Sequence, residues 1–375
     1  MSALSVRGGR DARGEPLDLV IIDGVVGSGP TYETLDATGL VVAPGLIDLQ
    51  VNGAGGVDVT HQPERLAEVG AELVRHGVTA YLPTVITSSP ETRSAALKAW
   101  QEVSADSGAV PLGLHLEGPM ISPERRGAHP EQWLRAPSLD LVEGWSRASG
   151  VVMATLAPEL PGALEVIAEL VRRGVVVSVG HTNATAAEVV AAVSAGAVCA
   201  THLYNAMPPL VGRESGPVGA VLGGVLIGGL IVDGIHLDQH AVRTAWNALG
   251  PERFWSVSDT TAALGLGDGP TRLGGQDVIV ADGAVRLADG TLAGSAASLT
   301  DCVRTLWSTV GCSLSEALST ATSTPARIVG DQTRGTLAPG ARGDVVLLDV
   351  DEPTARLDVV ATVVGGRVAF DARDA

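Results

Sequence analysis

The hydrophobic pattern of the chain consists of short apolar runs that alternate with amphipathic segments. The runs are rich in Val, Ile and Leu and close on Gly, Pro, Asp or Asn, which is typical of buried strands. The segments between them repeat apolar residues about every three to four positions, as helices do. The clearest predicted helices are 63–77, 90–103, 184–196 and 238–250. The predicted strands are 41–51, 79–87, 110–118, 151–159, 175–182, 197–205, 226–236 and 254–262.

This alternation predicts a barrel of parallel strands. Parallel strands need long crossover connections, which helices provide, and eight such units close into an α/β (β/α)8 barrel of the TIM type. Segments 1–43 and 335–375 do not follow the alternation and are typical of short strands with turns. A β pattern in both flanks predicts a small β-sandwich domain formed by both termini, with a catalytic barrel over 44–334 inserted into it.

Composition then narrows the function classes. The chain has 42 acidic and 25 basic residues, a formal net charge of −17, so its average field repels nucleic acids and anionic membranes. An aromatic content of 3% disfavours stacking on single-stranded bases. The most apolar stretch, 218–232, is broken by glycines and is shorter than a membrane span needs. Three cysteines without a CxxC pair, and an N-terminus without an apolar leader, predict a cytoplasmic protein.

Histidines and acids gather at the carboxyl ends of the predicted strands, where barrel enzymes place their chemistry. A single histidine in an apolar strand is often only a hydrogen-bonded core residue, but several at one rim indicate a site. Glu117 and Asp259 each end an almost wholly apolar run, and burying a carboxylate is costly unless a cation offsets the charge. Five of the eight histidines lie at the rim or in its loops: His115, His129, His181, His202 and His236.

These residues predict a divalent metal site with one open position. Glu117, His181 and His202 can supply one carboxylate and two imidazoles, a donor set that suits catalytic zinc. Iron, manganese or cobalt suit the same ligands. Asp259 is then free to carry a proton to and from water. On the first strand Gln50 and Asn52 stand at the i, i+2 positions where many metal hydrolases have histidines.

A series of motifs runs in order along nearly the whole chain. They are PGLIDLQVNGAGG, HLEGPMISPERRGAH, VGHTNAT, THLYNAMPPLVGRESG, VDGIHLD, SDTTAALG, LAGSAASL and GTLAPGARGDVVLLD. With these motifs the chain resembles the amidohydrolase superfamily and, within it, the N-acetylglucosamine-6-phosphate deacetylases. PGLID and GARGDVVLLD mark only the superfamily, whereas HLEGP followed by GHTNAT and HLYNAMPP is more specific. The resemblance implies metal-dependent hydrolysis of N-acetyl-D-glucosamine 6-phosphate to D-glucosamine 6-phosphate and acetate, in amino-sugar catabolism.

The resemblance also implies roles for individual residues. Glu117, His181 and His202 would hold one metal ion, with zinc favoured, and Asp259 would be the catalytic acid/base. Gln50 and Asn52 would replace an HxH pair that helps to hold a second metal in the wider superfamily, although some members of the deacetylase family are described with two. The implied substrate-binding residues are Ala128, His129, Asn205, Ala206, Arg213, His236, Leu292, Ala293, Gly294 and Ser295.

Arg213 and His236 are expected at the phosphate or acetamide end of the substrate. An acidic protein needs a local cation for a phosphate, which supports Arg213, whereas the adjacent Arg125 and Arg126 are expected to face water. The family is commonly dimeric, so a homodimer is expected, with the phosphate contact made within one subunit or across the interface.

Three alternatives stay open at this point. N-acetylgalactosamine 6-phosphate differs from the first substrate only in the direction of one hydroxyl. An N-acyl amino acid hydrolase would carry extra ligands on the first strand, which Gln50 and Asn52 disfavour. A non-catalytic barrel used as a scaffold would have lost one of the four central residues, and Glu117, His181, His202 and Asp259 are all present.

Overall fold

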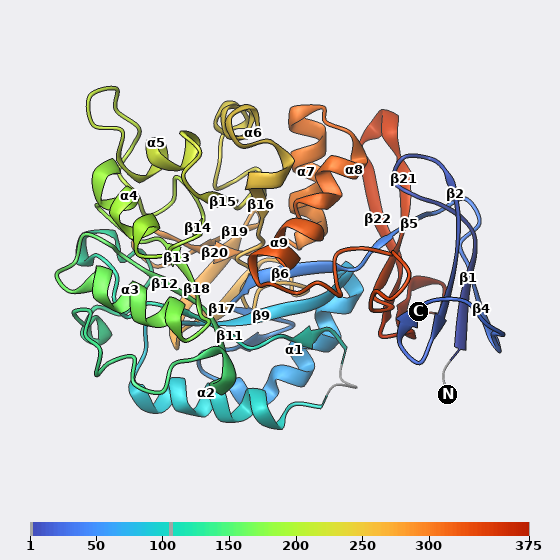
Figure 1. Ribbon diagram of the computed structural model, residues 1–375, viewed down its shortest axis with the longest axis horizontal. Helices are drawn as coiled ribbons and strands as arrows, with labels where there is room; N and C mark the ends of the chain where they lie inside the picture. Colours follow the sequence, from blue (N-terminus) through green and yellow to red (C-terminus); the bar gives the residue numbers. More distant parts are fainter. Residues whose placement is uncertain (1–2, 105–107, 375) are drawn as a thin grey trace.

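A computed structural model describes residues 3–104 and 108–374. At its centre, strands β6, β9 and β11 to β16 lie side by side as a parallel barrel (Figure 1). An isolated parallel bridge joins Val51, at the end of the first strand, to Thr260, just after the last. The barrel predicted from the sequence is confirmed. Its strands are β6 (Leu46–Val51), β9 (Val78–Ile86), β11 (Leu114–Glu117), β12 (Val151–Leu156), β13 (Val176–Val179), β14 (Cys199–Ala200), β15 (Ile227–Leu230) and β16 (Phe254–Ser256), and β10 (Val110–Pro111) pairs with β9.

The helices cover the barrel, and α2, α4, α6, α7 and α8 begin at side chains that cap them. At α4, for example, Thr185 accepts a hydrogen bond from the backbone N–H of Glu188, whose carboxylate accepts from the Thr185 backbone in return. This capping box ends the loop that carries His181. The helices are α1 (Leu66–Leu73), α2 (Pro90–Glu102), α3 (Ala163–Arg172), α4 (Ala186–Ser194), α5 (Gly216–Leu222), α6 (Gln239–Arg253), α7 (Leu299–Val310), α8 (Leu314–Ser319) and α9 (Ser323–Ile328).

Short 3-10 turns complete the helical elements. They are η1 (Pro63–Arg65), η2 (Val74–His76), η3 (Pro123–Arg125), η4 (Glu131–Trp133), η5 (Arg147–Ser149), η6 (Glu352–Thr354) and η7 (Ala372–Asp374). Of these, η3 is important for the site, because it lies in the loop after β11 and adjoins the His181 loop.

Both termini build the predicted small β domain. Its mixed sheet has the order β23-β22-β21-β5-β1-β2-β3, with β4 beside β1, and curls into two layers around its own core (Figure 1). The two ends of the chain meet where β5 pairs antiparallel with β21, Pro44 opposite Val345. The domain boundaries at 43/44 and 334/335 stay a prediction. The strands are β1 (Ala3–Arg10), β2 (Pro16–Ile22), β3 (Val25–Val26), β4 (Glu33–Asp36), β5 (Val41–Pro44), β21 (Val345–Asp351), β22 (Arg356–Val364) and β23 (Arg367–Asp371).

The apolar run 41–51 is divided between the two domains. Its first half is β5 of the terminal sheet and its second half is β6 of the barrel, so the single strand predicted there is two. Gly45 stands at the division. A Cβ on Gly45 would lie 2.2 Å from Thr79 Oγ1, so only glycine allows the chain to pass so close to β9.

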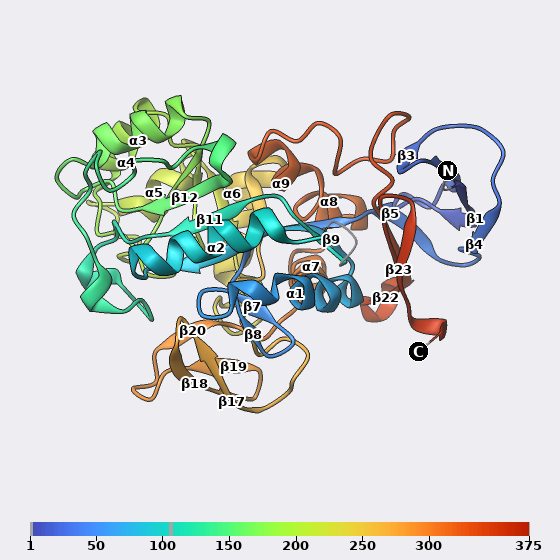
Figure 2. The same ribbon diagram turned by 90° about the horizontal axis from the view of Figure 1, so that it is seen from below.

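A further antiparallel sheet, which the sequence pattern did not predict, lies between β16 and α7. Figure 2 shows it below the barrel, beside the small hairpin of β7 (Gly53–Ala54) and β8 (Val57–Asp58). At its tip, Gly275 N–H donates to Asp58 Oδ2 at 3.1 Å, and the Gln276 side chain donates to the carbonyl oxygen of Ala128. Its strands are β17 (Gly269–Leu273), β18 (Gln276–Ala281), β19 (Ala284–Arg286) and β20 (Leu292–Ser295).

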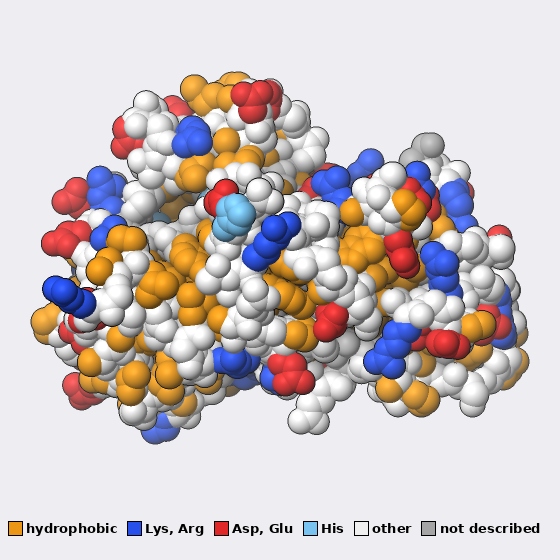
Figure 3. Space-filling view, turned by 90° about the horizontal axis from the view of Figure 1, so that it is seen from above, with side chains coloured by type: hydrophobic (Ala, Val, Ile, Leu, Met, Phe, Trp, Pro, Cys, Tyr) orange, Lys and Arg blue, Asp and Glu red, His pale blue; other side chains and the backbone are white. Residues whose placement is uncertain are grey.

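The surface carries mixed charges between apolar patches. On the face in Figure 3, Lys and Arg side chains are interspersed with Asp and Glu side chains. Among the described residues, every helix falls short of the length and apolar character that a membrane crossing needs. Cys199, Cys302 and Cys312 are all free thiols.

Candidate active site

Three side chains from different strands meet at the carboxyl end of the barrel. Glu117 ends β11, His181 follows β13 and His202 follows β14. Glu117 Oε1 lies 3.2 Å from His181 Nε2 and 3.1 Å from His202 Nε2, and the two Nε2 atoms are 3.1 Å apart. All three side chains are buried. The structure therefore brings the three predicted metal ligands to one point.

The hydrogen bonds of His181 indicate that a cation or a proton belongs between His181 and Glu117. Its Nδ1 lies 2.8 Å from the carbonyl oxygen of Arg125, which can only accept, so Nδ1 carries the proton. In the neutral ring, Nε2 then presents a lone pair to Glu117 Oε1 and His202 Nε2. A lone pair that faces a carboxylate oxygen is repulsive unless a cation or proton lies between them. The orientation of His181 through Nδ1 is the one that metal-bound histidines use.

The spacing of the three atoms also fits a metal ion. Ligands placed tetrahedrally about 2.0–2.1 Å from a zinc ion are about 3.3–3.4 Å apart. The observed separations of 3.1–3.2 Å are close to that value. The Nδ1 atom of His202 is buried and has no hydrogen-bond partner among the described residues. Glu117, His181 and His202 thus fit a divalent ion.

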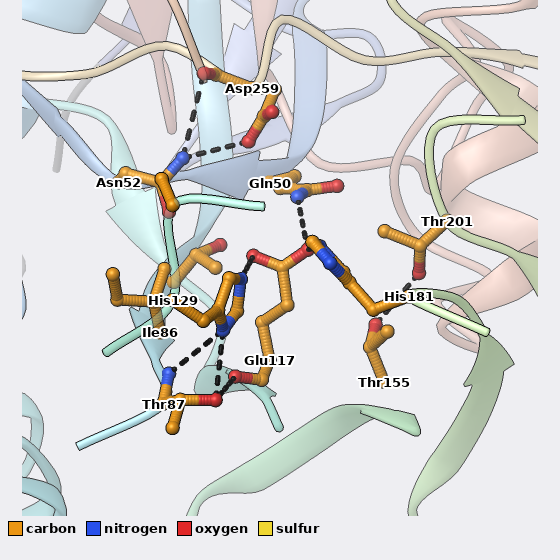
Figure 4. Close-up of polar contacts among 12 residues, drawn as sticks. Gln50, Asn52, Ile86, Thr87, Glu117, His129, Thr155, His181, Thr201 and Asp259 are labelled. Atoms are coloured by element: carbon orange, nitrogen blue, oxygen red, sulfur yellow. Dashed lines mark hydrogen bonds and ion pairs between the residues drawn. The ribbon is translucent and has the colours of Figure 1, made fainter. Parts of the chain in front are cut away.

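A second grouping of ligand atoms competes with this one. Glu117, His129 and His181 also bring potential ligand atoms within 4.8 Å of one another. In Figure 4, however, His129 points its Nδ1 at Thr87, whose backbone N–H donates to it at 3.3 Å. An Nδ1 that accepts a hydrogen bond leaves the proton on Nε2, which faces Glu117 Oε2 at 3.6 Å. His129 is therefore better placed as a hydrogen-bond donor than as a ligand, and His202 is the better third ligand.

Charge at Glu117 is balanced by its neighbours. Burial raises the pKa of Glu117, but its contacts with His129, His181 and His202 outweigh burial and hold the pKa well below its usual range. Burial lowers the pKa of His181 to about 4. Burial also lowers the pKa of His202, but its contact with Glu117 dominates and raises it. The histidine contacts thus offset the cost of burying one ionised carboxylate, which is what a bound cation would also do.

Asp259 faces the same cavity from the opposite side of the barrel mouth. Burial and the charge of Glu117 raise the pKa of Asp259 to about 6. Its Oδ1 accepts a hydrogen bond from Asn52 Nδ2 at 2.7 Å (Figure 4). A carboxyl group that titrates near neutral pH is suited to take up and release a proton. Gln50, the other member of the first-strand pair, donates from Nε2 to Glu117 Oε1 at 3.0 Å.

The site residues adopt an unusual backbone conformation. His181, His202 and Asp259 have φ angles of 48°, 29° and 51°, in the left-handed region that non-glycine residues rarely adopt. Each such residue costs about 1–3 kcal/mol, and strain of this kind gathers at functional sites. The turn after each strand directs these side chains into the barrel mouth.

A buried hydrogen-bond network supports the backbone of Asp259. Beneath it, Asp48 accepts hydrogen bonds from the Ser258 hydroxyl and from Gln50 N–H, the latter at 3.2 Å. Ser295 N–H donates to the Asp259 carbonyl oxygen at 2.9 Å, and its hydroxyl donates to the Ser258 carbonyl oxygen at 2.7 Å. Burial raises the pKa of Asp48 to about 7. In the sequence, the only signal of this network is the charged Asp48 inside the apolar run LIDLQV.

A cavity of about 320 Å³ opens above these groups. Most of the predicted site residues line it, but Gln50, Arg213 and Ser295 do not. Arg213 lies on an exposed loop, and Ser295 is buried behind the cavity wall. The predicted residues in the lining are Asn52, Glu117, Ala128, His129, His181, His202, Asn205, Ala206, His236, Asp259, Leu292, Ala293 and Gly294.

Several lining residues were not predicted as site residues. Leu273 and Thr291 come from the β17–β20 region, which had no separate sequence prediction. Glu124 and Arg125 come from η3, and Arg125 was expected to face water. Ile86 and Ile231 lie within the predicted strands 79–87 and 226–236, and the sequence pattern did not show that their side chains line the cavity.

Comparisons with known proteins show which family the chain resembles over its length. Residues 41–369 match the model of the amidohydrolase family. The N-acetylglucosamine-6-phosphate deacetylase of Rattus norvegicus is 39% identical over 361 residues, which are 92% of this chain and 87% of that protein.

Solved structures give the same result. The crystal structure of N-acetylglucosamine-6-phosphate deacetylase from Pasteurella multocida superposes with a TM-score of 0.90 at 31% identity, covering 98% of this chain and 99% of the other. A mutant of the Mycobacterium smegmatis deacetylase, in complex with N-acetyl-D-glucosamine-6-phosphate, gives a TM-score of 0.88 at 33% identity, covering 98% and 99%.

Proposed function

Because this chain belongs to the amidohydrolase family, we propose that its barrel site hydrolyses the acetamide of N-acetyl-D-glucosamine 6-phosphate. The products are D-glucosamine 6-phosphate and acetate, as expected for an enzyme of amino-sugar catabolism. The observation that carries the proposal is the arrangement of Glu117, His181 and His202 at one point, with Asp259 on the same cavity. Relatives named for this activity are similar over almost the whole chain.

The metal set that we propose is Glu117, His181 and His202 around one divalent ion. Zinc suits one carboxylate and two imidazoles, and iron, manganese and cobalt suit them as well. Such an ion supplies Lewis-acid polarisation of the amide carbonyl and lowers the pKa of water. Gln50 supports a single ion, because its amide donates to Glu117 where the HxH pattern would offer an imidazole.

The chain's own residues then move the proton. Asp259, ionised above its pKa of about 6, accepts a proton from the attacking water. The same carboxyl group passes this proton to the sugar nitrogen as the carbon–nitrogen bond breaks. His129, with its proton on Nε2, can donate a hydrogen bond to the oxygen on which negative charge develops.

The sugar is held by the residues around the cavity. Asn205 and Ala206 line the cavity, and so does the 292–294 segment. His236 lines the cavity as well, and its Nδ1 is 2.7 Å from Asp233 Oδ2, which fixes the orientation of the ring. Ser295 follows the 292–294 segment directly and is buried outside the cavity lining.

Arg213 is proposed to act from a second copy of the chain. It is exposed and lies outside the cavity of its own subunit, on a loop with the exposed apolar residues Leu210 and Val211. A loop of this kind is suited to reach a neighbouring subunit, which supports a homodimer. Three free thiols support a reducing compartment such as the cytoplasm.

The proposal is tested by elemental analysis of the purified protein, followed by acetate-release assays. The substrates are N-acetylglucosamine 6-phosphate, N-acetylgalactosamine 6-phosphate and an N-acetyl amino acid. We expect about one divalent ion per chain and the highest kcat/KM for the first substrate. A higher kcat/KM for N-acetylgalactosamine 6-phosphate would make that sugar phosphate the substrate. If none of the three compounds released acetate, the proposed deacetylase activity would be wrong.

A further inference from the structure

His115 is a buried histidine that the proposed reaction does not use. Its side chain is fully buried and does not line the substrate cavity. Nδ1 of His115 lies 3.1 Å from the carbonyl oxygen of Leu49, which can only accept, so Nδ1 carries the proton. In the neutral ring Nε2 is then an acceptor, and it lies 2.7 Å from Thr155 Oγ1. His115 therefore joins β6, through Leu49, to β12, through Thr155.

Hydroxyl groups continue this connection across the barrel interior. Because the Thr155 hydroxyl donates to His115, its oxygen accepts from the Thr201 hydroxyl at 2.7 Å (Figure 4). Thr201 Oγ1 accepts in turn from the Ser178 hydroxyl at 2.6 Å. All of these side chains are fully buried. We call His115, Thr155, Thr201 and Ser178 the His115 chain, in which the shared hydrogens all point towards the Leu49 carbonyl oxygen.

The His115 chain adjoins two of the proposed metal ligands along their strands. His115 and Glu117 are two residues apart on β11, so their side chains leave the same face of that strand. Thr201 immediately precedes His202 at the end of β14. The chain thus fixes the strand positions from which Glu117 and His202 extend.

Gly180, the residue before His181, packs against the same chain. A Cβ on Gly180 would lie 2.8 Å from Thr155 Cγ2 and 2.8 Å from Thr201 Cβ, which is too close for a side chain. The backbone that leads to His181 therefore rests on the two threonines. The third proposed ligand is thus connected to the His115 chain as well.

The backbone at the two histidine ligands needs such support. His181 and His202 have φ angles of 48° and 29°, and a backbone in this region persists only where the surrounding structure enforces it. Branched apolar side chains usually fill the interior of a barrel, and a buried polar network is favourable only when its members are satisfied. Four polar side chains in this layer therefore indicate a need for fixed geometry that apolar packing does not meet.

We infer that the His115 chain positions the three proposed metal ligands, so that the site is already arranged for a divalent ion before the ion binds. The inference rests on the proposed function, because the ligand set is proposed there. The side chains of the His115 chain do not line the cavity, so they act through the ligands and are positioning residues. Their effect is on the affinity and coordination geometry of the metal.

The test breaks the chain at Thr155 with two variants of similar size. Thr155→Val keeps the shape of the side chain and removes the hydroxyl, whereas Thr155→Ser keeps the hydroxyl. The matched control is Thr362→Val. Thr362 is also fully buried, but it lies on β22 in the terminal sheet, and its hydroxyl donates to the Val74 carbonyl oxygen at 2.7 Å.

Three measurements are made on each full-length variant. Titration of the metal-free protein with zinc, in competition with a chelating dye, gives the metal affinity. The visible absorption spectrum of the cobalt-loaded protein reports the geometry of the ligands. Urea unfolding of the metal-free protein gives the stability, so that a change in metal binding can be separated from a general loss of folding.

We expect Thr155→Val to weaken zinc binding about 10- to 100-fold, as loss of a group that orients metal ligands does. Its cobalt spectrum should differ from that of the unmodified protein. Thr155→Ser should restore both the affinity and the spectrum. Thr362→Val should lose stability, because it also lacks one buried hydrogen bond, but its zinc affinity and cobalt spectrum should be unchanged.

Other results overturn the inference. Unchanged zinc affinity and cobalt spectrum in Thr155→Val would make the His115 chain part of the core alone. An equal loss of affinity in Thr155→Ser would assign the effect to the methyl group, and an equal loss in Thr362→Val would assign it to stability. If Thr155→Val does not fold, Thr201→Val breaks the next link and is measured in the same way.

A failure of the proposed function gives a different result. If the unmodified protein binds no divalent ion or releases no acetate, the proposed function itself is wrong. If it binds zinc and releases acetate, and Thr155→Val keeps the same zinc affinity, only the role of the His115 chain is wrong.

Discussion

Asn52 Nδ2 lies 2.7 Å from Asp259 Oδ1, so an amide of the first strand supports the group that we propose as the proton carrier. Gln50, two residues earlier, supports Glu117 in the same way at 3.0 Å. The pair that stands in place of two histidines therefore binds carboxylates. It orients the two acids that the reaction needs.

Asn52→Leu should move the acidic limb of the kcat/KM profile to higher pH. The hydrogen bond from Asn52 lowers the pKa of Asp259, against burial and the charge of Glu117, which raise it. Without that bond the pKa rises further, and a higher pH is needed to ionise the base. The profile should be measured from pH 5 to 9 with metal in excess. An unchanged acidic limb would assign it to another group.

Asp259→Asn should abolish turnover while metal content and folding persist. An amide cannot take a proton from water, and loss of a general base costs about 10²- to 10⁴-fold in rate. The amide keeps the size of the side chain and can still pair with Asn52. Single-turnover acetate release and elemental analysis on the same sample give both quantities. A variant that retains most of its kcat would remove Asp259 from the mechanism.

His202→Ala and His129→Ala should separate the two possible ligand groups. His202 Nε2 lies 3.1 Å from both Glu117 Oε1 and His181 Nε2, so its loss should empty the metal site. His129 accepts from Thr87 N–H through Nδ1, so His129→Ala should keep the metal. The rate should then fall about 10²- to 10³-fold through the lost donor. Metal loss in His129→Ala, with retention in His202→Ala, would reverse the assignment.

Asp48→Asn should remove part of the pH dependence of stability. Burial raises the pKa of Asp48 to about 7, so between about pH 4 and 7 the unfolded chain has lost this proton while the folded chain retains it. The contribution of Asp48 is fully present at low pH and falls by up to about 4 kcal/mol as pH rises through that window. Asparagine stays neutral, so the variant should gain stability relative to the unmodified protein as pH rises.

Urea unfolding at pH 5, 6.5 and 8 measures this difference. The control is Asp140→Asn, an exposed aspartate, which should leave the pH dependence unchanged. Parallel curves for Asp48→Asn and the unmodified protein would mean that Asp48 is ionised in the folded state throughout.

The barrel strands and helices could be predicted from the sequence because their hydrophobic pattern is periodic. The ends of some strands and the β17–β20 sheet depend on contacts between distant residues. Buried parallel strands and capped helices leave a regular signal, and 79–87 corresponds closely to β9 (Val78–Ile86). The division of 41–51 depends on the approach of Gly45 to Thr79, which no local pattern records. The strands of the β17–β20 sheet are short, and in β18 the exposed Ile279 between the buried Val278 and Val280 hides the alternation of burial from the sequence.

For the site, residue type gave the metal cluster but not the direction of side chains. Glu117 and the two histidines could be predicted because a carboxylate and imidazoles at the carboxyl ends of buried strands indicate a shared metal ion. The hydrogen-bonded state of His129 depends on Thr87, 42 residues away, and is visible only in the folded chain. Adjacent arginines usually face water, so the place of Arg125 in the cavity wall required the contact with Asn183.

The pairing of β5 with β21 has a consequence for protein synthesis. Strand β5 leaves the ribosome early, but its partner follows about 300 residues later, after the whole barrel. At typical translation rates of about 5–20 residues per second, the edge of β5 stays unpaired for at least about 15 seconds until β21 is synthesised. An open strand edge is prone to pair with other chains. Nascent chains of this protein should therefore depend on chaperones until β21 emerges.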